Sequence, residues 1–194
     1  MTTTDPIDRF ASLFEHVVSL GIPEPNAMCL STVDTNGRPS SRMVLLKEFD
    51  AEGFVFYTNL ESRKGMDMRG NASVALCFFW QQIGRQVRIE GDVNLVTPEE
   101  ADAYFASRPR GSQIGAWASS QSRPLESRAE LLERVAEIER TYADLPIPRP
   151  PFWSGYRVVP RRIEFWTAEL FRLHERDLYE RQSDGGWSQS LLYP

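Results

Sequence analysis

The feature that most constrains the fold is a series of short strand-like segments joined by tight turns between Ala27 and about Val96. Ala27–Asp34 and Ser40–Phe49 flank Thr35-Asn36-Gly37, and an Asn-Gly pair between apolar runs is a strong hairpin signal. The further strands expected in this series are Phe54–Asn59, Ala72–Trp80 and Arg85–Val96. Strands joined by hairpins run antiparallel, because parallel neighbours need long crossover connections. The sequence therefore predicts an antiparallel sheet or barrel.

Helical patterns interrupt these strands without an alternating βαβ rhythm. After Asp5-Pro6, apolar residues recur at helical spacing as far as Val18, so a helix is expected within residues 1–22. Further helices are expected at Ser62–Arg69, from the Thr97-Pro98-Glu99-Glu100 capping box onward and at Ser127–Tyr142, with strands returning at Tyr156–Trp166, Leu170–Tyr179 and Trp187–Leu192. The expected fold is a single mainly β domain, residues 1–194, with peripheral helices.

Charge and composition limit the partners of the chain. The net charge is −5, so we expect neither nucleic acid nor an anionic membrane as a partner, and any bound anion needs a local cluster of basic residues. The longest apolar run, Ala72–Trp80, is too short to cross a bilayer as a helix. Met1–Asp5 lacks a basic start and an apolar run, so we expect no secretory signal and a cytoplasmic protein. Cys29 and Cys77 are expected as reduced, buried thiols, and no metal site is expected.

The first basic cluster follows the end of a predicted strand. Tyr57-Thr58-Asn59 is succeeded by Ser62-Arg63-Lys64, which would open a helix with a capping serine and two cations. A helix N-terminus beside Arg and Lys suits a phosphate monoester, and cations there are disfavoured by the helix dipole unless an anion is present. An ordinary capped helix with a solvated first turn is the alternative.

The second cluster is the strand Ser41–Lys47. Alternation sends Arg42, Val44 and Leu46 to one face and Met43, Leu45 and Lys47 to the other. Cations flanked by apolar residues need partners, whereas an edge strand kept soluble by its charges is the competing interpretation.

Two more clusters lie towards the C-terminus. Tyr104 precedes Arg108-Pro109-Arg110-Gly111-Ser112-Gln113, where we expect the end of a helix followed by a basic loop. The simpler interpretation is that Arg108 and Arg110 interact with the last carbonyls of that helix. Glu164-Phe165-Trp166 is followed by a predicted strand whose alternation would put Arg172, His174 and Arg176 on one face. That row favours an anionic or aromatic ligand opposite it, with a solvated barrel exterior as the alternative.

In this order and spacing the segments resemble the pyridoxamine 5′-phosphate oxidase family. The matching runs are Ser41–Lys47, Phe56–Lys64, Arg85–Gly91, Tyr104–Ala116, Gln121-Ser122, Glu164–Trp166 and Arg172–Arg176. The resemblance covers residues 23–194. It implies an FMN-binding split β-barrel that works as a homodimer with FMN at the subunit interface.

The resemblance also implies roles for individual residues. The cofactor contacts would be Arg42, Met43, Val44, Leu45, Leu46, Lys47, Tyr57, Thr58, Arg63, Lys64, Gln86, Gln121, Ser122, Trp166 and Arg176. The substrate phosphate would be held by Lys47, Tyr104, Arg108 and Ser112. Arg172 and His174 would cover the pyridine ring and act as the catalytic residues. Bound phosphates would explain why an acidic protein carries so many directed cations.

The implied reaction oxidises pyridoxamine 5′-phosphate or pyridoxine 5′-phosphate to pyridoxal 5′-phosphate, with dioxygen reduced to hydrogen peroxide. The alternatives are a related flavin oxidase acting on a phenazine-like aromatic acid, and a split-barrel protein that binds FMN or haem without turnover. One departure from the family pattern is Glu175, where aspartate is usual between the histidine and the last arginine. The charge is kept and the reach is longer.

Overall fold

The computed structural model describes residues 5–194, and their strands form a nine-stranded sheet in which every neighbouring pair is antiparallel. The order is β2-β1-β5-β6-β7-β4-β3, and β8 pairs with both β7 and β9. The strands are β1 Ala27–Val33, β2 Pro39–Leu45, β3 Glu48–Asp50, β4 Gly53–Asn59, β5 Ser73–Trp80, β6 Arg85–Leu95, β7 Trp153–Thr167, β8 Glu175–Arg181 and β9 Trp187–Leu191. The mainly β fold predicted from the hairpins is confirmed.

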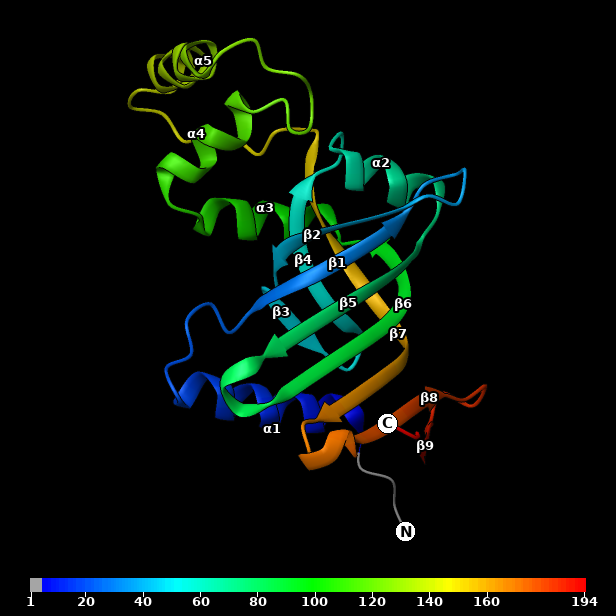
Figure 1. Ribbon diagram of the computed structural model, residues 1–194. Helices are drawn as coiled ribbons and strands as arrows, with labels where there is room; N and C mark the ends of the chain where they lie inside the picture. The colour runs from blue at the N-terminus through cyan, green and yellow to red at the C-terminus, as the bar shows by residue number, and fades with distance from the viewer. Residues whose placement is uncertain (1–4) are drawn as a thin grey trace.

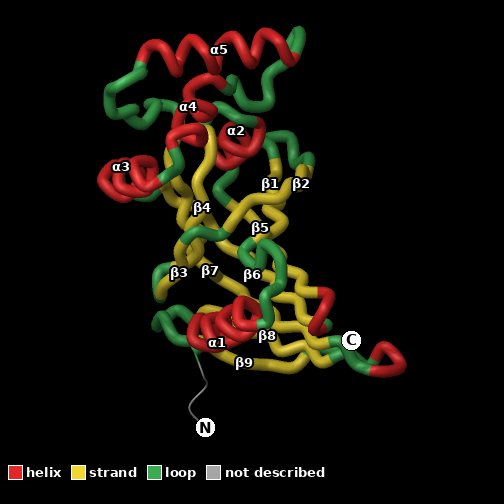
Figure 2. The backbone as a smooth tube through the Cα atoms, turned by 90° about the vertical axis from the view of Figure 1, so that its left-hand side faces the viewer, coloured by secondary structure: helices red, strands yellow, loops and turns green. Residues whose placement is uncertain are grey.

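The helices lie at the two ends of the strands (Figure 1). They are α1 Pro6–Ser19, α2 Arg63–Gly70, α3 Pro98–Ser107, α4 Arg110–Ala118 and α5 Arg128–Thr141, with short 3-10 turns at Gln81–Ile83 and Leu170–Arg172. Figure 2 shows α2, α4 and α5 gathered at one end of the molecule, while α1 lies at the other beside β8 and β9. The capping box predicted at Thr97 opens α3, and Ser62 and Ser127 cap α2 and α5.

The core lies inside the curved sheet and is closed at one end by α1. Phe10 of α1 is fully buried, and its ring meets Phe49 and Phe54 edge-on with centroid distances of 5.0 Å. Residues 6–19 thus act as a packing helix, although Val18, expected on the apolar face, is exposed. The expectation of no secretory signal falls on Met1–Thr4, which lie outside the described residues.

Three expected elements have different boundaries. The strand predicted at Ser40–Phe49 is broken at Leu46 and Lys47, where the backbone changes partners. The Leu46 N–H donates to Asn26 and the Lys47 N–H to Val55, so the chain passes from the β1 side of the sheet to the β4 side. Alternating hydrophobicity continues through this switch, which is why the pattern concealed it.

The other two corrections concern predicted site residues. Residues 110–113 begin α4 instead of a loop, because Pro109 caps the helix and its carbonyl accepts from the Ser112 and Gln113 N–H groups. The strand predicted from Leu170 begins only at Glu175, because Phe171 and Arg172 have left-handed backbones with φ of 56° and 63°. Arg172 and His174 therefore do not lie on a strand face with Arg176.

A bulge in β7 resets the alternation of its side chains. Glu90 pairs with Arg162 and Gly91 with Pro160, which leaves Arg161 as an extra residue. Gly91 is required at this point, because a Cβ there would lie 2.2 Å from the Val159 carbonyl oxygen. Beyond the bulge, Ile163 and Phe165 face the core.

The two cysteines are free and lie directly opposite each other in the β1–β5 pair. Cys29 and Cys77 are half-buried, whereas the sequence predicted that both would be fully buried. Burial raises the pKa of the Cys77 thiol, and the nearby Cys29 adds to this effect. Within residues 5–194, no helix is both long and apolar enough to span a membrane, and no cluster of three potential metal ligands occurs.

Candidate active site

A cleft of about 660 Å³ lies where the ends of β2 and β4 meet α2, α3, α4 and the start of β7. The predicted site residues that line it are Met43, Val44, Leu45, Lys47, Tyr57, Thr58, Lys64, Tyr104, Arg108, Ser112 and Gln121. Segments far apart in the sequence therefore converge on one concave surface. The predicted phosphate-binding set, Lys47, Tyr104, Arg108 and Ser112, is complete in this cleft.

Parallel aromatic rings form one wall of the cleft. The Tyr57 and Tyr104 rings stack at 3.9 Å, and the Trp153 ring lies parallel to Tyr57 at 5.4 Å. Gly155 makes room for this stack, because a Cβ there would come within 2.7 Å of the Tyr57 ring. Burial raises the pKa of Tyr57 to about 12, so its hydroxyl stays protonated and can donate a hydrogen bond.

Lys64 is a buried cation at the base of the cleft. Its side chain turns back from α2, and Nζ donates to Gln121 Oε1 at 2.9 Å, to Ser62 Oγ at 3.1 Å and to Thr58 Oγ1 at 3.2 Å. These partners are neutral, and Lys64 is only 8% exposed. Burial, with a further contribution from Arg42, lowers the pKa of Lys64 to about 8. A cation held in this way suits an incoming phosphate.

Arg42, on the same strand as the cleft residues Met43 and Val44, does not itself line the cleft. It donates to Thr32 Oγ1 at 2.7 Å, to Ser40 Oγ at 3.0 Å and to the Leu30 carbonyl at 3.2 Å, and it lies 3.7 Å from buried Asp67. Burial lowers its pKa despite Asp67. The partner expected for a cation on an apolar strand is therefore Asp67, which also accepts from Thr32 at 2.7 Å. The predicted contact residue Arg63 is exposed at the start of α2.

Arg108 supplies the clearest sign of an anion-binding site. Within residues 5–194, its Nη1 is buried and has no hydrogen-bond partner. Its guanidinium lies over the Trp153 ring at 4.9 Å, and burial lowers its pKa. Lys47 Nζ lies 5.9 Å from the Tyr104 centroid in the same cleft. An unpaired, buried guanidinium N–H beside a lysine, a tyrosine and a serine fits a phosphate group.

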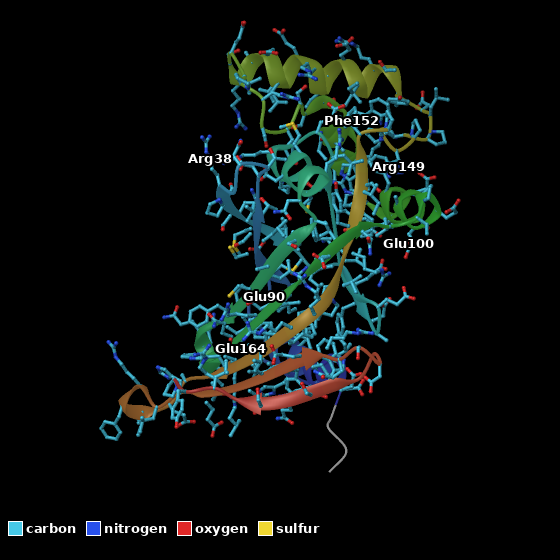
Figure 3. The ribbon with its side chains drawn as sticks, turned by 90° about the vertical axis from the view of Figure 1, so that its right-hand side faces the viewer. Arg38, Glu90, Glu100, Arg149, Phe152 and Glu164 are labelled. Carbon is cyan, nitrogen blue, oxygen red and sulfur yellow. The ribbon has the colours of Figure 1, made fainter. Side chains whose placement is uncertain are left out.

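Arg110 binds the carbonyl end of a different helix from the one that its sequence position suggested. It caps the end of α5 and not α3: Nη2 donates to the Tyr142 and Ala143 carbonyls at 2.8 Å, and Nη1 donates to Leu145 at 3.2 Å. The guanidinium thereby ties the first turn of α4, which carries Ser112, to the neighbouring helix. The loop that bears Arg149 and Phe152 leads from this region into β7 (Figure 3).

A second group of predicted residues lies near the opposite end of β7. Gln86 pairs with Trp166, and Trp166 pairs with Arg176, so three adjacent strands bring them together. The His174 ring lies 4.6 Å from the Trp166 ring, and the Glu169 N–H donates to His174 Nδ1 at 3.1 Å, which leaves Nε2 available to a ligand. Arg172 is exposed on the adjoining turn.

The two groups are too far apart to touch one small ligand within a single chain. Gly155 adjoins Tyr57 in the cleft, whereas Trp166 lies near the other end of the same strand. At about 3.3 Å per residue, the strand between them spans roughly 35 Å before bending. The described chain therefore holds the predicted residues in two separate groups, which we call, after their predicted role, the cleft half-site (the cleft residues above) and the strand half-site (Gln86, Trp166, Arg172, His174 and Arg176).

Besides Arg42 and Arg63, two further predicted contacts lie outside both groups, and several cleft residues were not predicted. Leu46 is buried in the core, and Ser122, with a left-handed φ of 71°, lines a neighbouring depression that Gln121 also borders. The unassigned cleft residues are Asn59, Ser107, Pro109, Gly115, Ala116, Ser119 and Trp153. Trp153 opens β7 and stacks against Tyr57, a placement that only the folded register shows.

Comparisons with known proteins agree with this geometry. Residues 14–142 match the family model for pyridoxamine 5′-phosphate oxidase, and residues 153–194 match the pyridoxine 5′-phosphate oxidase C-terminal dimerisation region. The pyridoxine/pyridoxamine 5′-phosphate oxidase of Myxococcus xanthus is 60% identical over 100% of this chain and 94% of its own. That of Rubrobacter xylanophilus is 55% identical over 98% of this chain and 87% of its own.

Solved structures show the same architecture. PhzG from Burkholderia lata 383, in complex with tetrahydrophenazine-1-carboxylic acid, superposes with a TM-score of 0.93 at 31% identity, covering 99% of this chain and 94% of that chain. A pyridoxamine 5′-phosphate oxidase-related, FMN-binding protein from Nostoc punctiforme covers 100% of both chains, with a TM-score of 0.78 at 17% identity.

Fold and cleft together define an FMN-dependent oxidoreductase built on a split β-barrel. More narrowly, the chain belongs to the pyridoxamine 5′-phosphate oxidase family.

Proposed function

We propose that the protein oxidises pyridoxamine 5′-phosphate, pyridoxine 5′-phosphate or both to pyridoxal 5′-phosphate, while dioxygen is reduced to hydrogen peroxide. The observation that carries this proposal is the buried, unpartnered Nη1 of Arg108 among the described residues, in a cleft shared with Lys47, Tyr104 and Ser112. Lys64, with its own neutral partners, forms a separate cationic site that suits the phosphate of FMN. The group around Arg108 therefore suits the phosphate of a second ligand, the substrate. One cleft with two anion sites fits two phosphorylated ligands.

The cofactor would be held mainly by Lys64, Thr58 and Gln121, with Arg42 contributing positive charge close to Lys64. Bound FMN would accept a hydride from the exocyclic carbon of the substrate. The chain's own residues bind and orient the reactants. Arg108, Lys47, Tyr104 and Ser112 would fix the substrate phosphate, so that the ring is presented in one orientation.

Completion of the site requires the strand half-site of a partner subunit. A span of roughly 35 Å along β7 separates the two half-sites of one chain. Residues 153–194, which include the strand half-site except Gln86, match the family's dimerisation region. In the proposed homodimer, FMN would be held at the subunit interface, with Trp166 and Arg176 of the partner subunit among the residues that hold it. Arg172 and His174 of that partner would cover the pyridine ring, with His174 Nε2 directed at the substrate's polar groups.

A second candidate substrate is a phenazine-like aromatic acid. The structure of the Burkholderia lata protein, which contains tetrahydrophenazine-1-carboxylic acid, superposes with a TM-score of 0.93. Against this candidate, a carboxylic acid has no phosphate to engage Arg108 together with Lys47, Tyr104 and Ser112.

The direct experiment uses purified protein loaded with FMN. We expect peroxide release and formation of pyridoxal 5′-phosphate on addition of pyridoxamine or pyridoxine 5′-phosphate under air. Lys64→Ala should lower FMN retention, whereas Arg172→Ala should retain FMN and lose turnover. Equal loss of FMN in both variants would contradict this division of roles. A flavin-loaded protein that oxidises a dihydrophenazine carboxylate but not the B6 phosphates would support the second candidate. A flavin-loaded protein that oxidises none of these compounds would refute both proposed activities.

A further inference from the structure

A ladder of charges runs across the outer face of β6, β7 and β8 and ends at the strand half-site. Its members are Arg88, Glu90, Arg162, Glu164, Arg176 and Glu180. Strand register puts Arg88 opposite Glu164, Glu90 opposite Arg162 and Arg162 opposite Glu180. Figure 3 labels Glu90 and Glu164, which lie in this part of the sheet. The same alternation carries Gln86 and Trp166 on this face.

Glu164 occupies a distinct place in the ladder, because it is its most buried carboxylate and the one that contacts Arg176. Its Oε1 accepts from Arg176 Nε at 2.8 Å, and its Oε2 accepts from Arg88 Nη1 at 2.9 Å. The residue is only 6% exposed. Burial alone would raise the pKa of Glu164, but the hydrogen bond from Arg176 and the charges of Arg176 and Arg88 lower it. Glu164 is therefore ionised at neutral pH.

Arg176 is held at two of its nitrogens. Nε is bound to Glu164, and Nη1 donates to the Tyr193 carbonyl at 2.9 Å. Among the described residues, these bonds leave the N–H groups of Nη2 available to a ligand. The guanidinium plane is thus fixed from two sides, beside Trp166 on the neighbouring strand. A guanidinium whose plane is already fixed binds an oxyanion or a ring edge with less loss of side-chain entropy than a mobile guanidinium does.

We propose that Glu164 is a positioning residue for the flavin: through its bond to Arg176 Nε, it fixes the arginine that meets FMN from the partner subunit. The inference rests on the proposed role of Arg176 and adds Glu164, which makes no contact with the cleft half-site. Glu90 serves as the matched comparison. It pairs with Arg88 and Arg162 in the same ladder, but it reaches Arg176 only through Arg88 and Glu164.

The experiment measures FMN affinity by calorimetry on apoprotein, without substrate. Glu164→Gln keeps the shape of the side chain and removes its charge, and we expect it to weaken FMN binding roughly five- to tenfold, as for the loss of a charge-assisted hydrogen bond. Glu90→Gln should change FMN affinity less than about twofold, as for a partly exposed pair. Glu164→Asp keeps the charge but cannot reach Arg176, so it should resemble Glu164→Gln and provides a second variant.

A double-mutant cycle separates positioning from general structural damage. If Glu164 acts through Arg176, adding Glu164→Gln to Arg176→Ala should weaken FMN binding no further. Additive losses, or equal losses in Glu164→Gln and Glu90→Gln, would overturn the proposal. If Arg176→Ala itself leaves FMN affinity unchanged, the proposed role of Arg176 fails, and the role of Glu164 fails with it. Because no substrate is present, failure of the B6 phosphates as substrates would not affect this measurement.

Discussion

Lys64 illustrates how a single residue can be kept ready for a ligand. It is buried against the neutral oxygens of Thr58, Ser62 and Gln121, so burial lowers its pKa to about 8. A phosphate dianion placed beside it would favour the charged form and raise that pKa. In the free protein, Lys64 is therefore protonated below about pH 8 and loses its charge above it.

The FMN affinity of the apoprotein is accordingly expected to depend on pH. As the pH rises through about 8, binding must increasingly take up a proton at Lys64, so affinity should fall towards pH 9.5, by up to about tenfold per pH unit. Calorimetry in buffers of different ionisation enthalpy would measure both the affinity and the proton uptake. Lys64→Met should bind FMN weakly at every pH and show no uptake centred near pH 8. A wild-type affinity that does not change between pH 7 and 9.5 would contradict this account.

Arg108 is expected to govern recognition of the substrate phosphate and not the stability of the fold. Its buried Nη1, without a partner in the part of the chain that the structure describes, is a cost in the free protein, so Arg108→Met should leave the melting temperature of the apoprotein unchanged or raised. The same variant should raise KM for pyridoxamine 5′-phosphate by about ten- to a hundredfold.

Unphosphorylated pyridoxamine provides the control for Arg108. Its turnover, expected to be weak, should be nearly the same in the wild type and in Arg108→Met, because it has no phosphate for the guanidinium to bind. A parallel loss with both substrates would mean that Arg108 acts on the ring or on the flavin.

At the residue scale, the sequence predicts which cations bind anions but not what supports them. Arg42 stands out because it is a charge among apolar strand residues, and Lys64 because it is a cation in the first turn of a helix, whereas Arg108 is assigned to a phosphate only through the family resemblance. Asp67 and Glu164, which hold Arg42 and Arg176, come from other segments, and only the folded register brings them into contact. Pairing across strands depends on register, which single-sequence periodicity does not contain.

At the scale of elements, the Tyr57 ring of β4 can lie against β7 because the residue opposite it in β7 lacks a side chain. Gly155 lies opposite Tyr57, and a Cβ at Gly155 would meet the Tyr57 ring at 2.7 Å and the Val96 side chain at 2.9 Å. The aromatic wall of the cleft therefore depends on this glycine.

Gly155→Ala should displace Tyr57 and destabilise the protein by about 1–3 kcal/mol, as for overpacking of a dense interior. Gly111→Ala is the matched control: it lies in α4 with nothing within 4 Å of its added Cβ, so it should be neutral or stabilise the protein by about 0.5–1 kcal/mol. Urea unfolding of the apoproteins measures both. Equal stability of the two variants would show that the Tyr57 stack adapts freely.

Hairpins and helix caps could be predicted at this scale, whereas changes of direction could not. The Asn36-Gly37 turn, the Thr97 capping box and the caps at Ser62 and Ser127 all lie where local chemistry predicts them. The break after Leu45 and the left-handed turn at Phe171 have no such local signal. Each depends on tertiary contacts. The break gives Leu46 and Lys47 different strand partners, and the turn takes Arg172 and His174 off the predicted strand face.

At the scale of the whole molecule, the two half-sites of one chain are expected to serve different active sites. We predict that mixing Lys64→Ala with Arg176→Ala subunits restores FMN binding. A mixed dimer has one site with both half-sites intact and one with both altered, so random exchange should restore about a quarter of the sites. The stoichiometry of tightly bound FMN after subunit exchange measures this.

The control for the mixing experiment uses two substitutions that both lie in the cleft half-site. Lys64→Ala mixed with Gln121→Ala should restore no binding, because every site of the mixed dimer then carries one altered cleft half-site. Restoration in both mixtures, or in neither, would contradict an FMN site at the subunit interface.

The bulge at Arg161 also bears on how chains of this kind can diverge by insertion and deletion. It is the extra residue of β7, and it sets which side chains beyond it face outward. Deleting it would turn Glu164 and Trp166 towards the interior and expose Ile163 and Phe165. Tolerated length changes should therefore accumulate in surface turns such as residues 182–186, while the number of residues in β7 stays fixed in descendants that keep the activity.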